Sequence, residues 1–315
     1  MTTTPRLSIG LPVYNGEDYL GESLDALLGQ TYGDFELIIS DNASTDRTEE
    51  ISRDYVARDS RVRYVRHPKN LGCAPNHNYC VDVARGELFK WASDDDLYAR
   101  DLLERCVTAL DELPHMVSAH SYTAIIDSDG KVITAVDYPL TTSSPLAAER
   151  FRSTLFAEGG DDDGAVIRTD VLRRIAPLDS YHHADRTIIS ELALHGPFHQ
   201  VPDWLYFRRD HPGRSEHEYP TVRKRCSNLD PKRADKLRHP TVRLLGEYVL
   251  GYATAIRRAP ISSLEKRECF RYLWQWMSKR AGAPAMGHMP EQPKADLGDR
   301  EISVHSIVAG QGASS

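Results

Sequence analysis

Apolar and polar positions follow one another in short blocks along the first 127 residues. Runs rich in β-branched and other apolar residues predict strands at residues 7–13, 36–41, 62–66 and 88–93. Segments with apolar residues at helical spacing follow these runs, at residues 19–30, 47–59, 74–84 and 99–113. This alternation predicts an α/β fold of the doubly wound, Rossmann-like kind, with a central, mostly parallel sheet flanked by helices.

Polar residues gather directly after each predicted strand. The four clusters read YNGE, SDNASTD, HPKNLG and SDDD in chain order. In such a sheet the carboxyl ends of the strands share one edge, and ligands bind in the crevice at that edge. The sequence therefore predicts a ligand site to which all four clusters contribute.

The last cluster places three carboxylates, Asp94, Asp95 and Asp96, at the end of an otherwise apolar run. Adjacent carboxylates repel one another unless a cation or fixed donors offset the charge. Mg²⁺ or Mn²⁺ suits such a site, because hard cations prefer oxygen ligands and keep positions for water and phosphate. A solvated acidic turn that caps the next helix is the alternative, but the three companion clusters favour a metal.

The pattern changes beyond about residue 127. We expect a hairpin turn at Asp129 and Gly130, a helix near residues 146–156, an acidic loop, a short strand and another helix. A further helix and two short strands then lead to the segment YFRRDHPGRS. The chain divides accordingly into residues 1–127, residues 128–219, a helical and basic C-terminal extension at 220–284, and a flexible tail at 285–315.

Composition narrows the functional classes. No apolar run approaches the ~20 residues that cross a bilayer, and the N-terminus lacks the pattern of a secretory signal, so we expect a cytoplasmic protein. The five cysteines form no CxxC pair, which argues against a disulfide framework or a structural zinc site. A net charge of −7 argues against nucleic-acid binding, which depends on neutralising phosphates with Lys and Arg.

Three long motifs together resemble one known family. They are GLPVYNGEDYL, QTYGDFELIISDNASTDRT and NLGCAPNHNYCVDVARGELFKWASDDD, and the shorter segments HHADR and RRDHPGRS add weak support. Over about residues 5 to 215 the chain resembles the inverting, nucleotide-sugar-dependent glycosyltransferases of family 2. The resemblance implies a GT-A fold, with donor binding in residues 1–127 and acceptor binding and the catalytic base in residues 128–219.

The resemblance also implies roles for individual residues. Asp94 and Asp95 match the DxD-like pair, with Asp95 as the metal ligand and Asp94 nearer the ribose or the sugar. Residues expected to line the base and ribose pocket are Pro12, Tyr14 and Glu17.

The clusters after the second and third strands are expected to complete the donor site. Asp41 and Asn42 belong to the second cluster, and the family often has a second Asp where this chain has Asn42. An amide oxygen still accepts the N3–H of a pyrimidine, so base recognition is retained. Asn70 and Gly72 shape the loop that faces the phosphates, or form a simple turn.

Glycosyl transfer to a hydroxyl also needs a base. A positioned carboxylate within hydrogen-bond reach of the acceptor usually takes the proton. We expect Asp185, in YHHADRTIISELALHG, to be this base, because it opens a helix downstream of the donor half, where the family places its base. A role as a helix cap is the alternative, and the acidic loop at 161–163 offers competing carboxylates.

The segment YFRRDHPGRS is the remaining candidate. Arg209 is expected to contact the diphosphate, since guanidinium groups form paired hydrogen bonds to phosphate oxygens, and His211 to complete the metal shell. An ordinary surface turn is the alternative, which Pro212 and Gly213 would explain by themselves. His182 and His183 would suit zinc, but a carboxylate-rich crevice suits a harder cation.

The sequence thus indicates a metal-dependent, inverting transferase that uses a UDP, dTDP or GDP sugar and a hydroxyl acceptor. A nucleotidyltransferase is one alternative, but it should carry a Gly-rich basic loop after the first strand, and VYNGEDY has no basic residue. A non-catalytic glycan- or nucleotide-binding protein on a decayed fold is another. The retention of Asp94, Asp95 and Asp185 argues against that reading.

The C-terminal helix LEKRECFRYLWQWMSKR is expected to be an interaction surface. It sets Phe270, Leu273, Trp274 and Met277 at helical spacing, with basic residues on either side. Three partners stay open: the chain's own catalytic domain, a second copy in a homodimer, or an anionic membrane at the inner face, where the protein would be peripheral.

Overall fold

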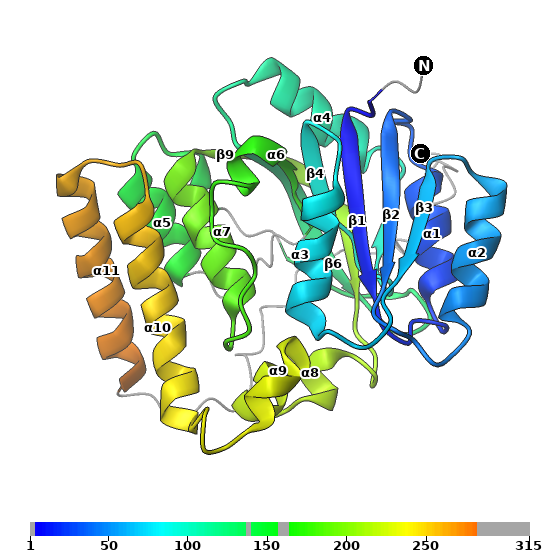
Figure 1. Cartoon of the computed structure of the whole chain (residues 1–315). Helices are drawn as coiled ribbons and strands as arrows, with labels where there is room; N and C mark the ends of the chain where they lie inside the picture. Colours follow the sequence, from blue (N-terminus) through cyan, green and yellow to red (C-terminus); the bar gives the residue numbers. More distant parts are fainter. Residues whose placement is uncertain (1–3, 137–139, 157–163, 282–315) are drawn as a thin grey trace.

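The computed structural model of the 315-residue chain describes residues 4–136, 140–156 and 164–281 (Figure 1). A nine-stranded sheet lies at its centre with helices on both sides, and the helices of the C-terminal part lie beyond one end of the sheet. The expected acidic loop at 161–163 and the expected tail at 285–315 fall outside the described residues.

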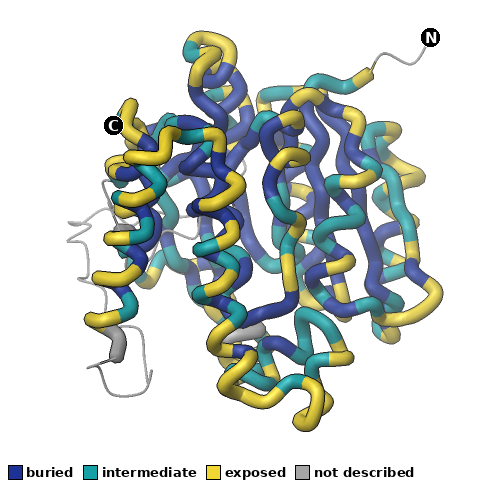
Figure 2. The backbone as a smooth tube through the Cα atoms, turned by 60° about the vertical axis from the view of Figure 1, so that its left-hand side comes forward, coloured by how far each residue is buried: buried dark blue, intermediate teal, exposed yellow. Residues whose placement is uncertain are grey.

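The first half follows the predicted alternation closely. The strands β1, β2, β3 and β4 span Leu7–Val13, Phe35–Asp41, Val62–Arg66 and Leu88–Trp91. The helices α1, α2, α3 and α4 span Leu20–Leu28, Thr48–Arg58, Cys73–Val83 and Leu102–Glu112. All four strands run parallel, in the order β3-β2-β1-β4. The near-continuous burial of β1, β2 and β4 (Figure 2) explains why these three read as apolar runs, whereas β3 is buried only at Val62.

The second half makes the sheet mixed. It contributes β5 (Leu97–Tyr98), β6 (Ser118–Ile126), β7 (Val132–Val136), β8 (Val166–Arg168) and β9 (Phe198–Arg209). β8 is antiparallel to both β4 and β6, so β6 runs in the direction of β4, and β9 is parallel to β6. The predicted hairpin between β6 and β7 is confirmed, with Gly130 in the left-handed region at φ 80°.

The two short strands expected before YFRRDHPGRS are a single strand, and that prediction was wrong. β9 pairs with β6 across a bulge: Ser121 lies opposite Val201 and Tyr122 opposite Trp204, which leaves Pro202 and Asp203 out of the register. Proline has no N–H to donate to the ladder and is tolerated at a bulge. The strand therefore continues past the proline, with a bend, instead of ending there.

The helices of the second half differ in length, and the two long ones come last in the chain. α5, α6 and α7 span Ala147–Phe156, Thr169–Leu172 and Ala184–His195. α8 (Ser215–Glu218) and α9 (Val222–Leu229) precede the two long helices, α10 (Thr241–Arg258) and α11 (Ser263–Ala281). The predicted helical C-terminal extension is thus confirmed as far as residue 281. No helix among the described residues is both long and apolar enough to cross a bilayer.

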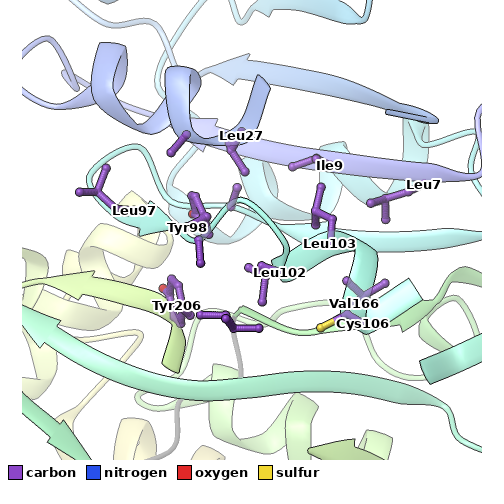
Figure 3. Packing of buried hydrophobic residues seen from close by; sticks show 14 of the residues in the cluster. Leu7, Ile9, Leu27, Leu97, Tyr98, Leu102, Leu103, Cys106, Val166 and Tyr206 are labelled. Atoms are coloured by element: carbon purple, nitrogen blue, oxygen red, sulfur yellow. The ribbon is translucent and has the colours of Figure 1, made fainter. Parts of the chain in front are cut away.

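The main core lies between the sheet and α1 and α4. Figure 3 shows Leu102, Leu103 and Cys106 of α4 turned toward Leu7 and Ile9 of β1 and Val166 of β8. Tyr98 and Tyr206 stack in the same core, with ring centroids 5.6 Å apart. The apolar face of α4 thereby joins the parallel and the mixed halves of the sheet into one unit.

The last helix packs on the chain itself. α11 lies against α5 and α10, and its buried stripe consists of Cys269, Leu273 and Trp276. Phe270 and Met277 pack at the border of this cluster, whereas the Trp274 side chain is 69% exposed. The sequence left three partners open for α11. In the structure, the buried stripe of this helix packs on α5 and α10 of the same chain.

A buried carboxylate ties the amino ends of the parallel strands together. Glu36 of β2 accepts hydrogen bonds from Ser8 Oγ (2.7 Å) and the Arg85 backbone N (2.9 Å), and from Arg63 Nη1 (2.7 Å) and Arg85 Nε (2.9 Å). Burial by itself raises the pKa of a carboxyl group. The hydrogen bonds from Arg85, Ser8 and Arg63 outweigh burial here, and the pKa of Glu36 is lowered.

Replacing Trp276 by Ala should lower the free energy of unfolding by about 3–5 kcal/mol, the usual cost of truncating a buried aromatic residue. Trp276 is 6% exposed. Trp274→Ala, on the same helix, is the matched control and should shift stability by less than about 0.5 kcal/mol. Denaturant unfolding followed by circular dichroism measures both, and equal effects would show that α11 does not dock as described.

Glu36→Gln should flatten the pH dependence of stability in the acidic range. Because the folded pKa of Glu36 lies below the unfolded value near ~4.3, its contribution is complete above that pH and is lost as the pH falls through the folded pKa. Unfolding midpoints between about pH 3 and 7 test this. The exposed Glu50→Gln should leave the slope unchanged, and the same slope in Glu36→Gln would contradict the assignment.

Candidate active site

The carboxyl ends of the long parallel strands meet at one edge of the sheet, the lower edge in Figure 1. The loops after β1, β2, β3 and β4 leave from this edge, and so does the segment after β9, because β9 runs in the same direction. α7 leads into β9 from this edge, so its first turn, with Asp185, also lies there (Figure 1). The topology therefore gathers the predicted site residues at one edge.

The loops after β1 and β2 interlock. The backbone N–H groups of Asn15, Gly16 and Glu17 donate to Ser44 Oγ (2.9 Å), Thr48 Oγ1 (2.9 Å) and Asp46 Oδ2 (3.0 Å). In return the Glu17 carboxylate accepts from the Arg47 backbone N at 3.1 Å. Pro12 is buried in β1, while Tyr14 at the rim is 45% exposed. Glu17 thus braces the loops, and Tyr14 is the aromatic ring left open to a ligand.

The predicted residues after β2 and β3 form one hydrogen-bonded unit. Asp41 accepts from the Ser44 backbone N (2.8 Å) and the Tyr64 hydroxyl (2.6 Å). Asn42 donates to Asn70 Oδ1 (3.1 Å) and accepts from the Leu71 backbone N (2.8 Å). These side chains are committed to holding the loop at 70–72 against the end of β2.

Gly72 is required by both conformation and space. Its φ of +95° favours glycine, and a Cβ atom there would lie 2.4 Å from the carbonyl oxygen of Leu229. Leu229 is the last residue of α9, so the C-terminal extension closes directly on the loop after β3.

The three carboxylates face different surroundings. Asp96 turns into the protein, where it accepts hydrogen bonds from the Tyr206 hydroxyl and from the Arg209 backbone N (2.9 Å). Asp94 lies against Gly16: a Cβ atom on that glycine would come within 2.2 Å of Asp94 Oδ2. Burial and the neighbouring charge of Asp95 raise the pKa of Asp94 to about 8. A cation beside these groups would reverse that effect and keep Asp94 ionised.

Asp95 is the carboxylate that meets the segment after β9. Its Oδ2 lies 3.0 Å from His211 Nε2, and Ser93 Oγ donates to its Oδ1. Burial alone would raise the pKa of Asp95, but Arg214, Ser93 and His211 outweigh it, and the pKa is lowered. The lowered pKa favours the ionised form of Asp95, which is paired with an imidazole from a distant part of the chain.

Asp95 and His211 form a donor pair that fits a divalent cation. Two adjacent ligands of an octahedral Mg²⁺, with bonds near ~2.1 Å, lie about 3 Å apart. Asp95 Oδ2 and His211 Nε2, which are joined here by a 3.0 Å hydrogen bond, lie at a similar separation. No group of three or more His, Cys, Asp or Glu among the described residues could hold a metal by itself. A cation that keeps most positions for water and phosphate needs only one or two protein ligands.

Arg209 is placed differently from the expectation. Its side chain is 1% exposed. The guanidinium donates to the carbonyl oxygens of Asp95 (2.8 Å) and Ser128 (2.7 Å) and to Glu22 Oε2 (2.7 Å), and it lies over the Tyr19 ring. Because these donors are used within the protein, the arrangement favours a positioning role over direct contact with a diphosphate.

Asp185 lies in the first turn of α7, half-buried, after His183, whose φ is 58°. His183 therefore occupies the capping position that the alternative reading gave to Asp185. α7, which carries Asp185, packs against α10. The pKa of Tyr252 on α10 is raised by burial, by Tyr248 and, to a smaller extent, by Asp185. The Tyr248 and Tyr252 hydroxyls lie 3.0 Å apart.

Sequence reasoning missed three residues of this region. Arg214 lies 3.5 Å from Asp96 and 4.0 Å from Asp95 and is the partly exposed cation at the cluster. Tyr206 supplies the hydroxyl to Asp96. Tyr219 is the third residue. Its pKa is raised by burial, by Glu218 and, to a smaller extent, by Tyr14. Arg214 and Tyr206 stand in the segment YFRRDHPGRS and could have been found there, whereas Tyr219 carries no sequence signal.

Comparison with known proteins agrees with this geometry. An uncharacterized glycosyltransferase of Haemophilus influenzae is 35% identical over 142 residues, covering 45% of this chain and 55% of that protein. The putative glycosyltransferase EpsE of Bacillus subtilis is 32% identical over 131 residues, covering 41% and 47%. The chain thus spans about half the length of these curated relatives.

Solved structures share the fold. S. aureus TarS in complex with UDP-GlcNAc gives a TM-score of 0.53 at 18% identity and covers 89% of this chain and 93% of that chain. The mannosyltransferase PcManGT from Pyrobaculum calidifontis, in complex with GDP-Man and Mn²⁺, gives 0.53 at 19% identity, covering 89% and 88%. At these identities the likeness concerns the fold, and it confirms the predicted GT-A architecture.

The family model described as glycosyl transferase family 2 matches residues 8–175, more than half of the chain. This range includes the four loops at the carboxyl edge and all three carboxylates. The chain belongs to glycosyltransferase family 2.

Proposed function

We propose that this glycosyltransferase moves a sugar from a nucleoside diphosphate donor to a hydroxyl acceptor, with inversion and with a bound Mg²⁺ or Mn²⁺. The observation that carries the proposal is the approach of Asp95 Oδ2 to His211 Nε2, 3.0 Å apart, at the edge where the donor loops meet. Two strands far apart in sequence deliver these groups, so the pairing is a product of the fold.

The donor would lie across the loops after β1 and β2. Tyr14 offers an exposed ring to the nucleobase, and Pro12 and the braced Glu17 set the position of that ring. Asp41, Asn42, Asn70 and Gly72 would act by holding the loop at 70–72 in place, with the second lone pair of the Asn42 oxygen available to a base. The solved neighbours bound to UDP-GlcNAc and to GDP-Man support a UDP, dTDP or GDP sugar.

Asp95 and His211 would hold the cation, with Asp94 next to the ribose or the sugar. A bound divalent cation stabilises the negative charge that develops on the departing diphosphate. Arg209 would fix the backbone of Asp95 through its 2.8 Å hydrogen bond, and Arg214 would offset the remaining charge of Asp95 and Asp96. The complex of PcManGT with GDP-Man and Mn²⁺ supports this choice of metal.

Asp185 would act as the base. It would accept the proton of the acceptor hydroxyl as that oxygen attacks the anomeric carbon. Attack from the face opposite the departing diphosphate gives a single displacement and inverts the configuration. The position of Asp185 in the first turn of α7, at the same edge of the sheet, supports this role.

Nothing in the site favours nucleotidyl transfer. A triphosphate needs free backbone N–H groups or basic side chains in the loop after β1. The N–H groups of Asn15, Gly16 and Glu17 already donate to side chains at 44–48. A screen of nucleotide sugars for metal-dependent release of nucleoside diphosphate, with and without acceptors, tests the proposed function and identifies the donor.

Asp95→Ala should abolish metal-dependent donor binding while the protein stays folded. Removing one acid from a repelling cluster relieves repulsion, so no loss of the fold is expected. Calorimetric titration of the donor with and without Mn²⁺ measures the effect. Asp203→Ala is the control, because Asp203 is an exposed residue of β9 that pairs with Arg105 of α4. An unchanged metal dependence in Asp95→Ala would remove Asp95 from the site.

Asp185→Asn should keep donor affinity but slow transfer by roughly 10²–10⁴-fold, the usual contribution of general-base catalysis. The control is Asp179→Asn, because Asp179 is exposed in the loop before α7 and pairs with Arg233. This variant should transfer sugar at the wild-type rate. Initial rates and donor titrations on both variants separate chemistry from binding. If Asp185→Asn turns over normally, the base lies elsewhere, and residues 161–163 become the first candidates.

A further inference from the structure

The bend between α9 and α10 concentrates positive charge in an acidic protein. Between Val222 and Arg243 the chain has eight Lys and Arg residues and two Asp residues, a net charge of +6, whereas the whole chain carries −7. Lys224, Lys232 and Lys236 are exposed and form no ion pair with any described residue. Arg238 and Arg243 are exposed as well. The three lysines therefore face solvent without an acidic partner among the described residues, whereas Arg238 pairs with Asp235 and Arg243 with Glu247.

The same bend exposes large apolar side chains. Leu237 is 95% exposed and Val242 is 77% exposed. Leu245 and Leu250 are also exposed, and at 100° per residue they lie about 60° and 80° to either side of Val242. The buried residues of α10 lie along a stripe at Leu244, Tyr248, Tyr252, Ala255 and Ile256. Val242 and Leu250 therefore lie on the outer side of α10, with Leu245 at the border of the buried stripe, and none of the three is covered by a described residue.

Hydrogen bonds to Asp235 fix the turn that carries Leu237. The Asp235 carboxylate accepts hydrogen bonds from the backbone N–H groups of Leu237 (2.9 Å) and Arg238 (3.2 Å), and the Asp235 carbonyl accepts from His239 N (2.9 Å). This turn displays the leucine between two cations, Lys236 and Arg238. A single exposed leucine is ordinary, but one fixed between cations and beside an apolar helix face forms an amphipathic surface.

We propose that this surface, residues 222–250, docks on an anionic lipid bilayer. A bilayer takes both halves of the surface, since anionic headgroups attract Lys and Arg while the interfacial region accepts Leu and Val side chains. An acidic glycan or a nucleic acid would use the cations but not Leu237 and Val242. A two-fold contact with a second copy would place a net charge of +5 against +5, because residues 222–250 also include Glu247, and like charges repel.

The surface adjoins the edge of the sheet that carries the candidate active site. The end of α9 meets the loop after β3 at Leu229 and Gly72, and α8, α9 and the start of α10 lie along the same lower edge in Figure 1 as the site. Figure 2 shows exposed positions predominating around this bend. Docking here would hold the crevice at the bilayer, where a lipid-linked hydroxyl acceptor would be presented; this last step alone rests on the proposed function.

Sedimentation of the full chain with vesicles tests the proposal without donor or acceptor, so its failure is distinguishable from failure of the proposed transfer. We expect binding to vesicles of phosphatidylcholine with phosphatidylglycerol, at least tenfold weaker binding to pure phosphatidylcholine, and loss of binding in high salt. Leu237→Asp with Val242→Asp should weaken binding at least tenfold. Leu264→Asp, an equally exposed leucine at the start of α11, should bind like the wild type.

Three outcomes would overturn the proposal. The first is no binding to anionic vesicles at low salt. The second is binding that depends on salt but is unchanged in the Leu237/Val242 double variant, which would indicate a purely ionic contact. The third is a dimer, detected by light scattering, that the double variant abolishes. Thermal unfolding of each variant confirms that the protein is folded before its binding is compared.

Discussion

Three carboxylates in succession at the end of a buried strand are the constraint on which this site depends. Burial and mutual repulsion both favour their neutral form. The protein resolves the conflict unequally: Asp96 is enclosed by Tyr206 and the Arg209 backbone, Asp95 stays ionised beside His211 and Arg214, and the pKa of Asp94 is raised to about 8. One negative group is thereby kept accessible, where a cation would meet a phosphate.

The compensating groups come from beyond the part of the chain that the family model covers. The match ends at residue 175, yet Tyr206, Arg209, His211 and Arg214 lie at the end of β9 and directly after it. β9 reaches the carboxylates because it continues across the bulge at Pro202 and Asp203 and stays parallel to β6. The part of the chain that the family model covers and the segment after β9 therefore form one electrostatic unit.

The sequence predicts the parts of this arrangement that depend on local pattern. Buried parallel strands read as apolar runs, and the strand–helix alternation predicts that β1 to β4 run parallel. The residues after those strands converge for the same reason. What the pattern does not contain is which of two similar residues turns inward. The predicted stripe of α11 included Trp274, but the structure buries Trp276, two positions further along the helix, and leaves Trp274 exposed.

The same limit applies within the site. Arg209 and Arg214 are equivalent as sequence symbols, and phosphate chemistry suits both. The structure separates them because the Arg209 guanidinium finds three acceptors on α1, the β4 loop and the β6–β7 turn, and these contacts become available only when distant elements meet. Tertiary contacts of this kind decide whether a cation is part of the scaffold or is open to a ligand.

Charge is separated along the carboxyl edge. The three carboxylates follow β4 at this edge, whereas the cations of the α9–α10 bend belong to the C-terminal extension. A nucleoside diphosphate is an anion, so the crevice by itself repels the phosphates that it is proposed to bind, and a bound cation and Arg214 reverse the sign locally. The cations of the bend attract anions at longer range, over about a Debye length of ~8 Å at physiological salt. Approach and capture of an anionic donor would thus depend on different sets of charges.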